Sequence, residues 1–288
     1  MSIRSLLGKI PGLRAAYHSL PSFKTEALRR EQERQAHIEY DKRMLQDAFH
    51  NDLTVRHGPF AGMRYLPDAS GSQVLPKILG SYEEPMHPWI EEIVLSKTYD
   101  LILDVGCAEG YYAVGFAWRL PHLRVLAFDI DPAARERTRQ LAKLNQVEDR
   151  VSVGSECSFE QFQQFGGPTT LIFCDIEGAE DVLLDPLKAP RLKECGILVE
   201  AHDVFFDGIS DRIFDRFAQS HYIRMVIDYP VRLSRYDLPD SDQLTSEDRA
   251  RLANEFRPSG MRFLFLKPLS SLAHNSDSII REPLLDEG

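Results

Sequence analysis

The sequence contains only four cysteines among 288 residues, and none of them forms a C-x-x-C pair. Cys107, Cys157, Cys174 and Cys195 are scattered along the chain, and the last two lie in or beside apolar stretches typical of strands. This spacing argues against a disulfide framework and against a zinc-binding motif. We therefore expect small buried side chains in a reducing compartment, for which the cytoplasm is the simplest location.

Basic residues and long apolar runs are also scarce. Lys and Arg total 34 against 44 Asp and Glu, which gives a net charge of −10. Proteins that follow nucleic-acid phosphates depend on clustered Lys and Arg, so nucleic acid is not an expected partner. No apolar run approaches the roughly 20 residues that span a bilayer. The hydrophobic content of 43% is that of a globular protein long enough for one domain plus an extension.

The first 23 residues carry basic side chains and no acidic one. Gly8 and Pro11 interrupt the continuous apolar core that a secretory signal requires. A basic amphipathic arm can lie on an anionic membrane surface. Packing on its own domain or on a subunit partner, as in a homodimer, is the alternative, and both stay open at this point.

Residues 1–95 are expected to form an N-terminal extension. Residues 23–49 lack Pro and Gly and favour one long helix at a surface or an interface. Residues 53–66 have the pattern of a short hairpin or turn with Gly and Pro between its two halves. Two helical pieces follow within residues 75–96, where two prolines break the pattern.

Residues 101–117, LILDVGCAEGYYAVGFA, predict a buried strand, a tight turn and a helix in immediate succession. Gly106 and Gly110 permit the turn because they lack a Cβ atom. Their G-x-x-x-G spacing differs from the G-x-G-x-x-G fingerprint of dinucleotide-binding proteins, which disfavours a nicotinamide cofactor. Asp104 and Glu109 in this stretch would suit a ligand that carries an ammonium group.

Strand and helix patterns alternate over residues 96–268 and predict a mostly parallel α/β sheet with helices on both faces. Polar residues end successive strands, at the edge where open α/β sheets bind ligands. Residues 229–260 form an insertion before the last strand, and residues 269–288 form a peripheral tail. The expected strands are 101–105, 123–130, 150–154, 169–176, 196–200, 222–228 and 261–267, and the expected helices are 133–144, 159–165, 179–187, 210–220 and 246–256, the last with Ser246 as its N-cap.

The segment 104–110 resembles motif I, D-x-G-x-x-x-G, of the class I S-adenosylmethionine-dependent methyltransferases. Seven strands with an antiparallel last hairpin match the Rossmann-like sheet of that superfamily, and the resemblance runs from about Tyr99 to Lys267. It implies S-adenosylmethionine as the cofactor, with Asp129 at the ribose and residues near Glu156 at the adenine. The expected cofactor-binding residues are Asp104, Gly106, Cys107, Ala108, Glu109, Gly110, Asp129, Ile130, Glu156 and Asp175. Asp131 is expected to cap a helix that Pro132 opens.

Two further motifs narrow the resemblance. CDIEGAE at residues 174–180 and LVEAHD at residues 198–203 look like the D-x-E-G-x-E and E-x-H signatures of the FkbM-type methyltransferases. That family implies O-methylation of sugars and natural products, so the expected acceptor is a small molecule or a saccharide. Ala179 departs from the pattern, because an aromatic residue is common there. Methylation of nitrogen or carbon stays open as an alternative, as does a catalytically silent cofactor-binding scaffold.

A hydroxyl acceptor needs a proton acceptor within hydrogen-bond reach. His202 is expected in that role because the ordinary pKa of histidine lies near neutral pH, and a purely structural histidine is the alternative. Neighbouring carboxylates could take the proton instead, or could hold a divalent cation that orients a sugar diol, although no metal site is assigned. The candidate catalytic residues are His202, Asp175, Glu200 and Glu177, and Arg232, Arg235 and Tyr236 of the insertion could close over the acceptor.

Overall fold

The computed structural model describes residues 35–70, 72–238 and 244–271. The chain divides into two compact units, residues 1–51 and residues 52–288. In the described part of the first unit, residues 35–47 are helical, within the range of the long helix that the sequence predicts. The basic arm and most of the C-terminal tail lie outside the described residues, so membrane-surface contact and a homodimer stay predictions.

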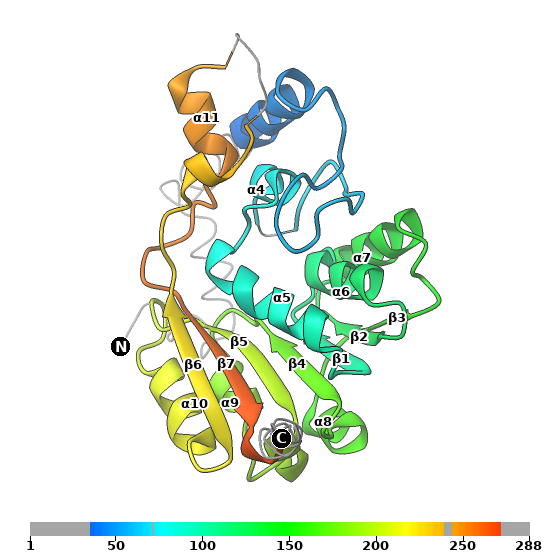
Figure 1. Cartoon of the computed structure of the whole chain (residues 1–288), viewed down its shortest axis with the longest axis vertical. Coiled ribbons are helices and arrows are strands. Elements are labelled where there is room, and N and C mark those ends of the chain that lie inside the picture. Colours follow the sequence, from blue (N-terminus) through cyan, green and yellow to red (C-terminus); the bar gives the residue numbers. More distant parts are fainter. Residues whose placement is uncertain (1–34, 71, 239–243, 272–288) are drawn as a thin grey trace, which may run out of the picture. The chain divides into compact units, whose positions relative to one another are not determined.

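A seven-stranded sheet forms the centre of the second unit (Figure 1). The strand order is β3-β2-β1-β4-β5-β7-β6. Strands β1 to β5 pair in parallel, and β7 is antiparallel to both of its neighbours. The mixed Rossmann-like sheet predicted from the sequence is therefore confirmed. The strands are β1 Leu101–Val105, β2 Arg124–Phe128, β3 Val151–Gly154, β4 Thr170–Cys174, β5 Gly196–Ala201, β6 His221–Ile227 and β7 Arg262–Pro268.

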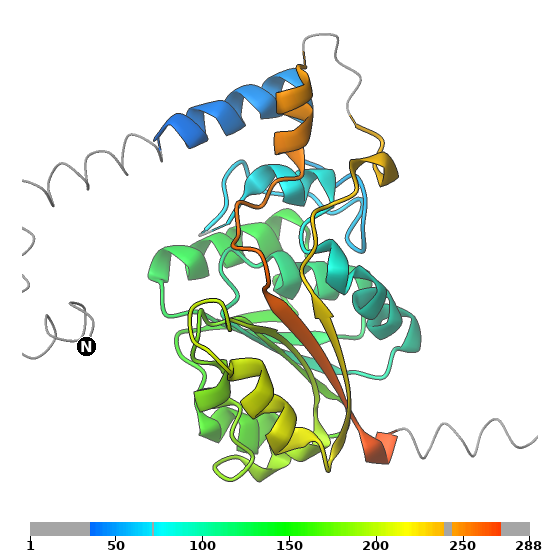
Figure 2. The ribbon, with the colours of Figure 1, turned by 90° about the vertical axis from the view of Figure 1, so that its left-hand side faces the viewer.

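Helices cover both faces of this sheet, which explains why every residue of β4 and β5 is buried. Helices α5, α6 and α7 lie on one side, and α8, α9 and α10 lie on the other (Figures 1 and 2). The helices of the second unit are α4 Val74–Leu79, α5 His87–Ser96, α6 Tyr111–Arg119, α7 Pro132–Leu144, α8 Phe159–Phe165, α9 Glu180–Leu183, α10 Ile209–Phe217 and α11 Ser246–Leu252, with short 3-10 turns η1 Glu84–Met86, η2 Pro190–Glu194 and η3 Leu233–Arg235.

Local sequence explains where several helices begin and end. Asp131 accepts a hydrogen bond from the Ala133 backbone N–H and caps α7, as predicted. The cap of α11 is Thr245 rather than Ser246, because Thr245 exchanges hydrogen bonds with Asp248 in a capping box. The helix predicted at 179–187 is a single turn, α9, because Pro186 has no backbone N–H with which to continue it.

Residues 52–96 differ from the predicted hairpin and broken helices. The hairpin is one isolated bridge between Thr54 and Arg64, and Pro88 lies in the first turn of α5, where its missing N–H costs nothing. Phe60 is fully buried and a Cβ atom at Gly115 of α6 would come within 2.7 Å of its ring. This segment therefore packs on the sheet domain, in the same unit, instead of continuing the extension that was expected over residues 1–95.

The four cysteines are buried and unpaired, as the sequence analysis expects. Cys157, Cys174 and Cys195 belong to the apolar core beneath α8, α9 and α10, and burial raises the pKa of the Cys157 thiol to about 12. These thiols are packing elements rather than nucleophiles. Among the described helices, none combines the length and the apolarity that a membrane span needs.

Candidate active site

One large cavity, of about 860 Å³, opens at the carboxyl ends of β1, β2, β4 and β5. Parallel strands bring their carboxyl ends to the same edge of a sheet, which is where open α/β folds bind ligands. One end of the cavity is formed by the motif I loop and the end of β2. The other end is formed by residues that follow β4 and β5 and by the last part of the insertion.

The motif I loop is held very close to the strand beside it. Gly106 has a φ of +90°, and a Cβ atom there would lie 1.6 Å from the carbonyl oxygen of Asp175. Gly110 has a φ of +93° at the N-terminus of α6, where a Cβ atom would lie 2.8 Å from the Thr138 side chain. Glycine is required at both positions. Gly106, Cys107 and Ala108 line the cavity, and Gly110 lies behind it.

Asp104 lies at the base of this loop and faces the cavity with only 1% of its surface exposed. It accepts a hydrogen bond from the Ala113 backbone N–H, while its Oδ2 atom has no hydrogen-bond partner among the described residues. Burial, followed by the nearby charge of Asp175, raises the pKa of Asp104 to about 8. A cationic group of a bound ligand would stabilise the ionised form.

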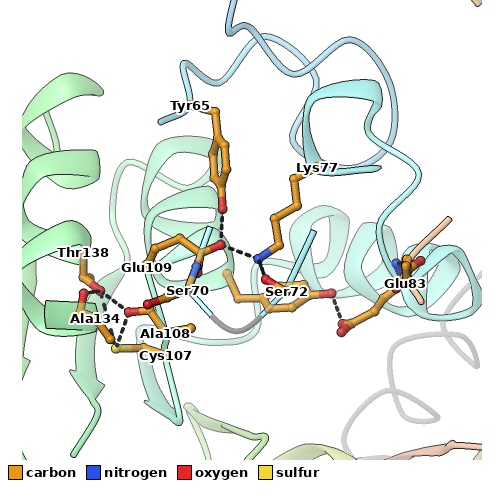
Figure 3. A network of polar contacts seen from close by, with 12 residues as sticks. Tyr65, Ser70, Ser72, Lys77, Glu83, Cys107, Ala108, Glu109, Ala134 and Thr138 are labelled. Carbon is orange, nitrogen blue, oxygen red and sulfur yellow. Dashed lines mark hydrogen bonds and ion pairs between the residues drawn. The ribbon is translucent and has the colours of Figure 1, made fainter. Parts of the chain in front are cut away.

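Glu109 was expected to serve the ligand's ammonium group, but the structure turns it away from the cavity (Figure 3). Its carboxylate is fully buried and accepts hydrogen bonds from the Tyr65 hydroxyl, from Lys77 Nζ and, at 2.8 Å, from the Ser70 backbone N–H. Burial opposes ionisation, yet Lys77 and these donors together keep the pKa of Glu109 below its usual range. Glu109 therefore joins residues 65–77 to motif I.

The segments that follow β2 and β3 supply the residues expected at the ribose and the adenine. Asp129 lines the cavity and accepts hydrogen bonds from the backbone N–H groups of Ala108 and Asp131, at 2.9 and 2.8 Å. These bonds fix the orientation of its carboxylate. Ile130, which is 82% exposed, and Glu156 line the outer part of the same cavity.

His202 lies at the opposite end, surrounded by carboxylates. Its Nδ1 atom is 2.8 Å from Glu180, and its Nε2 atom is 3.3 Å from Glu177 and 3.6 Å from Asp175. Burial lowers the pKa of His202, but the hydrogen bonds to Glu177 and Glu180 outweigh it and raise the pKa to about 11. His202 is therefore an imidazolium at neutral pH, which is not the proton acceptor that the sequence analysis expects.

Asp175 and Glu200 lie beside His202 at the ends of β4 and β5. Burial and the charge of Glu83 raise the pKa of Asp175 to about 7, and Asp175 Oδ1 is a buried atom without a hydrogen-bond partner among the described residues. Burial also raises the pKa of Glu200. One ligand atom from each of Asp175, Glu200 and His202 lies within 4.8 Å of the other two, so the three could hold a divalent cation.

Arg257 is the residue of this site that sequence reasoning missed. It forms ion pairs with Glu83 and Glu200, both at 2.7 Å, and with Glu255 at 2.9 Å. Glu83 and Glu200 come from distant segments, and no local motif marks them as partners of Arg257. The only available signal was the unexplained basic and acidic residues near the end of the insertion.

The insertion reaches the cavity through residues other than those expected. Glu255, Phe256, Arg257 and Pro258 line it. The expected contacts do not: Arg235 pairs with Glu84 at 2.5 Å, the Arg232 backbone N–H donates to the same carboxylate, and the Tyr236 ring packs edge-on against His57.

Residues 88–197 match the family described as ribosomal protein L11 methyltransferase (PrmA). Two curated relatives, the ribosomal protein L11 methyltransferases of Bacillus cereus (strain G9842) and Bacillus anthracis (strain CDC 684 / NRRL 3495), are each 36% identical over 97 residues. The match covers 34% of this chain and only 30% of the length of those relatives. The match with these relatives therefore spans less than a third of their length.

Two solved structures are similar to this chain at lower identity. An O-methyltransferase from Bacillus cereus in complex with SAH has a TM-score of 0.42 and 16% identity, covering 62% of this chain and 79% of its own. The O-methyltransferase TomG from Streptomyces achromogenes in complex with SAM has a TM-score of 0.43 and 12% identity, covering 63% of this chain and 80% of its own.

Proposed function

We propose that this chain, an S-adenosylmethionine-dependent methyltransferase whose cofactor is S-adenosylmethionine, transfers the methyl group to a hydroxyl of a small-molecule or saccharide acceptor. The observation that carries the proposal is the convergence of Asp175, Glu177, Glu200 and His202 at one end of the cavity whose other end is motif I. A hydroxyl placed between the two ends would have a proton acceptor on one side and the cofactor's methyl group on the other.

Methyl transfer is an in-line displacement at the sulfonium, so the protein must hold the acceptor and the methyl group in near-attack geometry. Asp175 is the proposed proton acceptor. Its Oδ1 atom has no hydrogen-bond partner among the described residues, and a pKa of about 7 suits a general base near neutral pH. Bound S-adenosylmethionine would supply the methyl group and leave as S-adenosylhomocysteine, and Asp175 would take the proton of the acceptor hydroxyl.

His202 then serves as a positioning residue. Its imidazolium contacts Glu180, which is fully buried. Glu180 also accepts hydrogen bonds from the backbone N–H groups of Ile176 and Gly178. The charge of His202 therefore fixes the loop that carries Asp175 and Glu177. In this arrangement the histidine orients the carboxylates and removes no proton itself.

The rim of the acceptor end supports an acceptor with flat or apolar parts. Phe205 and Phe256 line the cavity and are 55% and 48% exposed. Aromatic side chains with a few convergent polar groups are typical of small-molecule sites. Together with the motifs at residues 174–180 and 198–203, this rim favours the sugar and natural-product acceptors of the FkbM-type enzymes.

Methylation of a protein amine is the second candidate, because the curated relatives are ribosomal protein L11 methyltransferases. The excess of carboxylates around Arg257 and His202 would also suit a cationic amine. One experiment distinguishes methylation of a small molecule from methylation of a protein. Cofactor with a labelled methyl group is incubated with the small-molecule fraction and with the protein fraction of a cell extract, and the label is located by mass spectrometry. Label in small molecules supports the proposal, and label confined to proteins overturns it.

A divalent cation on Asp175, Glu200 and His202 would be an addition to this mechanism rather than a part of it. Glu200 already pairs with Arg257, and His202 pairs with Glu177 and Glu180. We therefore expect turnover to survive exhaustive chelation. Loss of turnover that magnesium restores would establish a metal requirement and would contradict this expectation.

A further inference from the structure

Lys77 is a buried cation in the cavity to which the mechanism gives no task. It lies on α4, its surface is only 2% exposed, and it lines the cavity next to Ser72 and Gln73. Burying an ammonium group is costly unless it is paired and hydrogen-bonded. We therefore expect Lys77 to have partners for both its charge and its N–H groups.

Among the residues that line the cavity, the basic side chains are Lys77, Arg257 and His202. Arg257 and His202 lie at the acceptor end, where each is already paired with carboxylates. Lys77 is also paired with a carboxylate, that of Glu109, one residue before the glycine that opens α6 (Figure 3). Lys77 is thus the cation that the chain places at the cofactor end.

The hydrogen bonds of Lys77 leave room for one more acceptor. An ammonium group has three N–H donors. Two described acceptors are present, Glu109 and, at 2.6 Å, the Ser72 hydroxyl. The ring of Tyr82 lies 4.4 Å below the nitrogen. Tyr65 and Ser70 also donate hydrogen bonds to Glu109, so the carboxylate keeps two neutral donors besides Lys77, which is the cation paired with it.

Asp104, at the base of the motif I loop, has an acceptor atom that lacks a donor in the described part of the chain. It is buried, it lines the cavity, and its Oδ2 atom has no hydrogen-bond partner among the described residues. The amino-acid end of S-adenosylmethionine carries one ammonium and one carboxylate group. The unpartnered Oδ2 atom of Asp104 and the remaining N–H of Lys77, both on residues that line the cavity, form a complementary pair for that zwitterion.

We propose that Lys77 binds the carboxylate of the cofactor's amino-acid end and that Glu109 positions Lys77 without touching the cofactor. Asp104 keeps the role that the sequence analysis expects for it, at the ammonium group. This assignment depends on S-adenosylmethionine as the cofactor and is independent of the acceptor. It also assigns a function to the segment 65–77, which supplies both the lysine and the residues that hold its partner.

Calorimetry with two ligands tests the assignment. One ligand is S-adenosylhomocysteine, and the other is its decarboxylated analogue, which keeps the ammonium group and lacks only the carboxylate. Lys77→Met should weaken S-adenosylhomocysteine by roughly 10- to 100-fold, the range expected for a charged hydrogen bond, and should change binding of the analogue by less than about twofold. Asp104→Asn should weaken both ligands by similar factors, and Lys143→Met on exposed surface of α7 should change neither.

A second pair of variants guards against misfolding, because Lys77→Met leaves Glu109 buried without its cation. Lys77→Met/Glu109→Gln removes both charges and should show the same ligand-specific loss. Glu109→Gln alone keeps an amide oxygen that can accept from Lys77, so it should weaken S-adenosylhomocysteine less than Lys77→Met does. Equal weakening of both ligands by Lys77→Met or by the double variant would overturn the assignment, and so would a loss of both ligands in Glu109→Gln.

Discussion

The cofactor end of the cavity is built mainly from two short continuous stretches, whereas the acceptor end is assembled from segments far apart in the chain. Residues 104–108 and 128–131 supply much of the first. Asp175, Glu200, His202 and Arg257 supply much of the second. The cofactor end is therefore visible as a motif, and the acceptor end depends on long-range packing. The predictions below, in order of decreasing effect, test whether the two ends can be separated by mutation.

Gly106→Val should abolish cofactor binding, because even a Cβ atom would lie 1.6 Å from the Asp175 carbonyl oxygen at a φ of +90°. Calorimetry with S-adenosylhomocysteine measures the loss, and circular dichroism checks the fold. Gly167→Ala is the matched control, since its Cβ would meet only the flexible end of Arg191 at 3.1 Å. Normal binding by Gly106→Val would show that motif I does not contact the cofactor.

Asp175→Asn should lower kcat by about 10²–10⁴, the usual contribution of a general base, and should change cofactor affinity far less. The wild-type rate should rise as the pH increases through about 7, because only the ionised carboxylate accepts the proton. The variant should lose this rise, and Asp215→Asn on α10 should keep it. A variant that lost cofactor binding and kept kcat would place Asp175 at the wrong end of the cavity.

Arg257→Met should destabilise the fold by roughly 3–5 kcal/mol, because it leaves Glu83, Glu200 and Glu255 buried without their shared cation. Denaturant unfolding measures the free-energy change, and Arg124→Met, at an exposed position of β2, is the control. Saturating S-adenosylhomocysteine should stabilise both variants equally. Selective loss of that stabilisation in Arg257→Met would mean that the acceptor end also binds the cofactor.

Glu109→Gln should cost about 1–3 kcal/mol at neutral pH, the price of weakening a buried charged hydrogen bond. The pKa of Glu109 is lowered from its usual 4.5, so its stabilising effect is fully present above that pH and is lost as the pH falls through the folded value. Unfolding free energies of wild type and variant should therefore converge on acidification. A gap independent of pH would show that the carboxylate is not ionised in the folded state.

The cofactor end follows largely from local sequence patterns, whereas the acceptor end depends on contacts between distant segments. This difference decides which features could be predicted from the sequence. Strand order, the glycine turn and the cap at Asp131 follow from local patterns, since apolar runs, φ-permissive residues and side-chain caps act within a few residues. The direction of Glu109 and the charge state of His202 do not, because Tyr65, Lys77 and Glu180 set them across long sequence distances. The N-cap predicted for the insertion helix was wrong by one residue, because the capping box begins at Thr245.

The functional residues also divide into those that local patterns predict and those that depend on contacts between distant segments. Asp104, Asp129 and Asp175 could be placed at the cavity because each ends or follows a strand. Arg257 could not, because two of its three carboxylate partners, Glu83 and Glu200, lie far from it in the sequence.

The most direct test of the central claim is carbon-13 NMR of the product formed from cofactor with a ¹³C-labelled methyl group and a pool of small-molecule and saccharide acceptors. O-methyl, N-methyl and C-methyl carbons resonate in separate regions of the spectrum. The account predicts a new O-methyl signal that requires the enzyme and almost disappears with Asp175→Asn. A methyl signal on nitrogen or carbon, or an O-methyl signal that Asp175→Asn leaves at full strength, would contradict it.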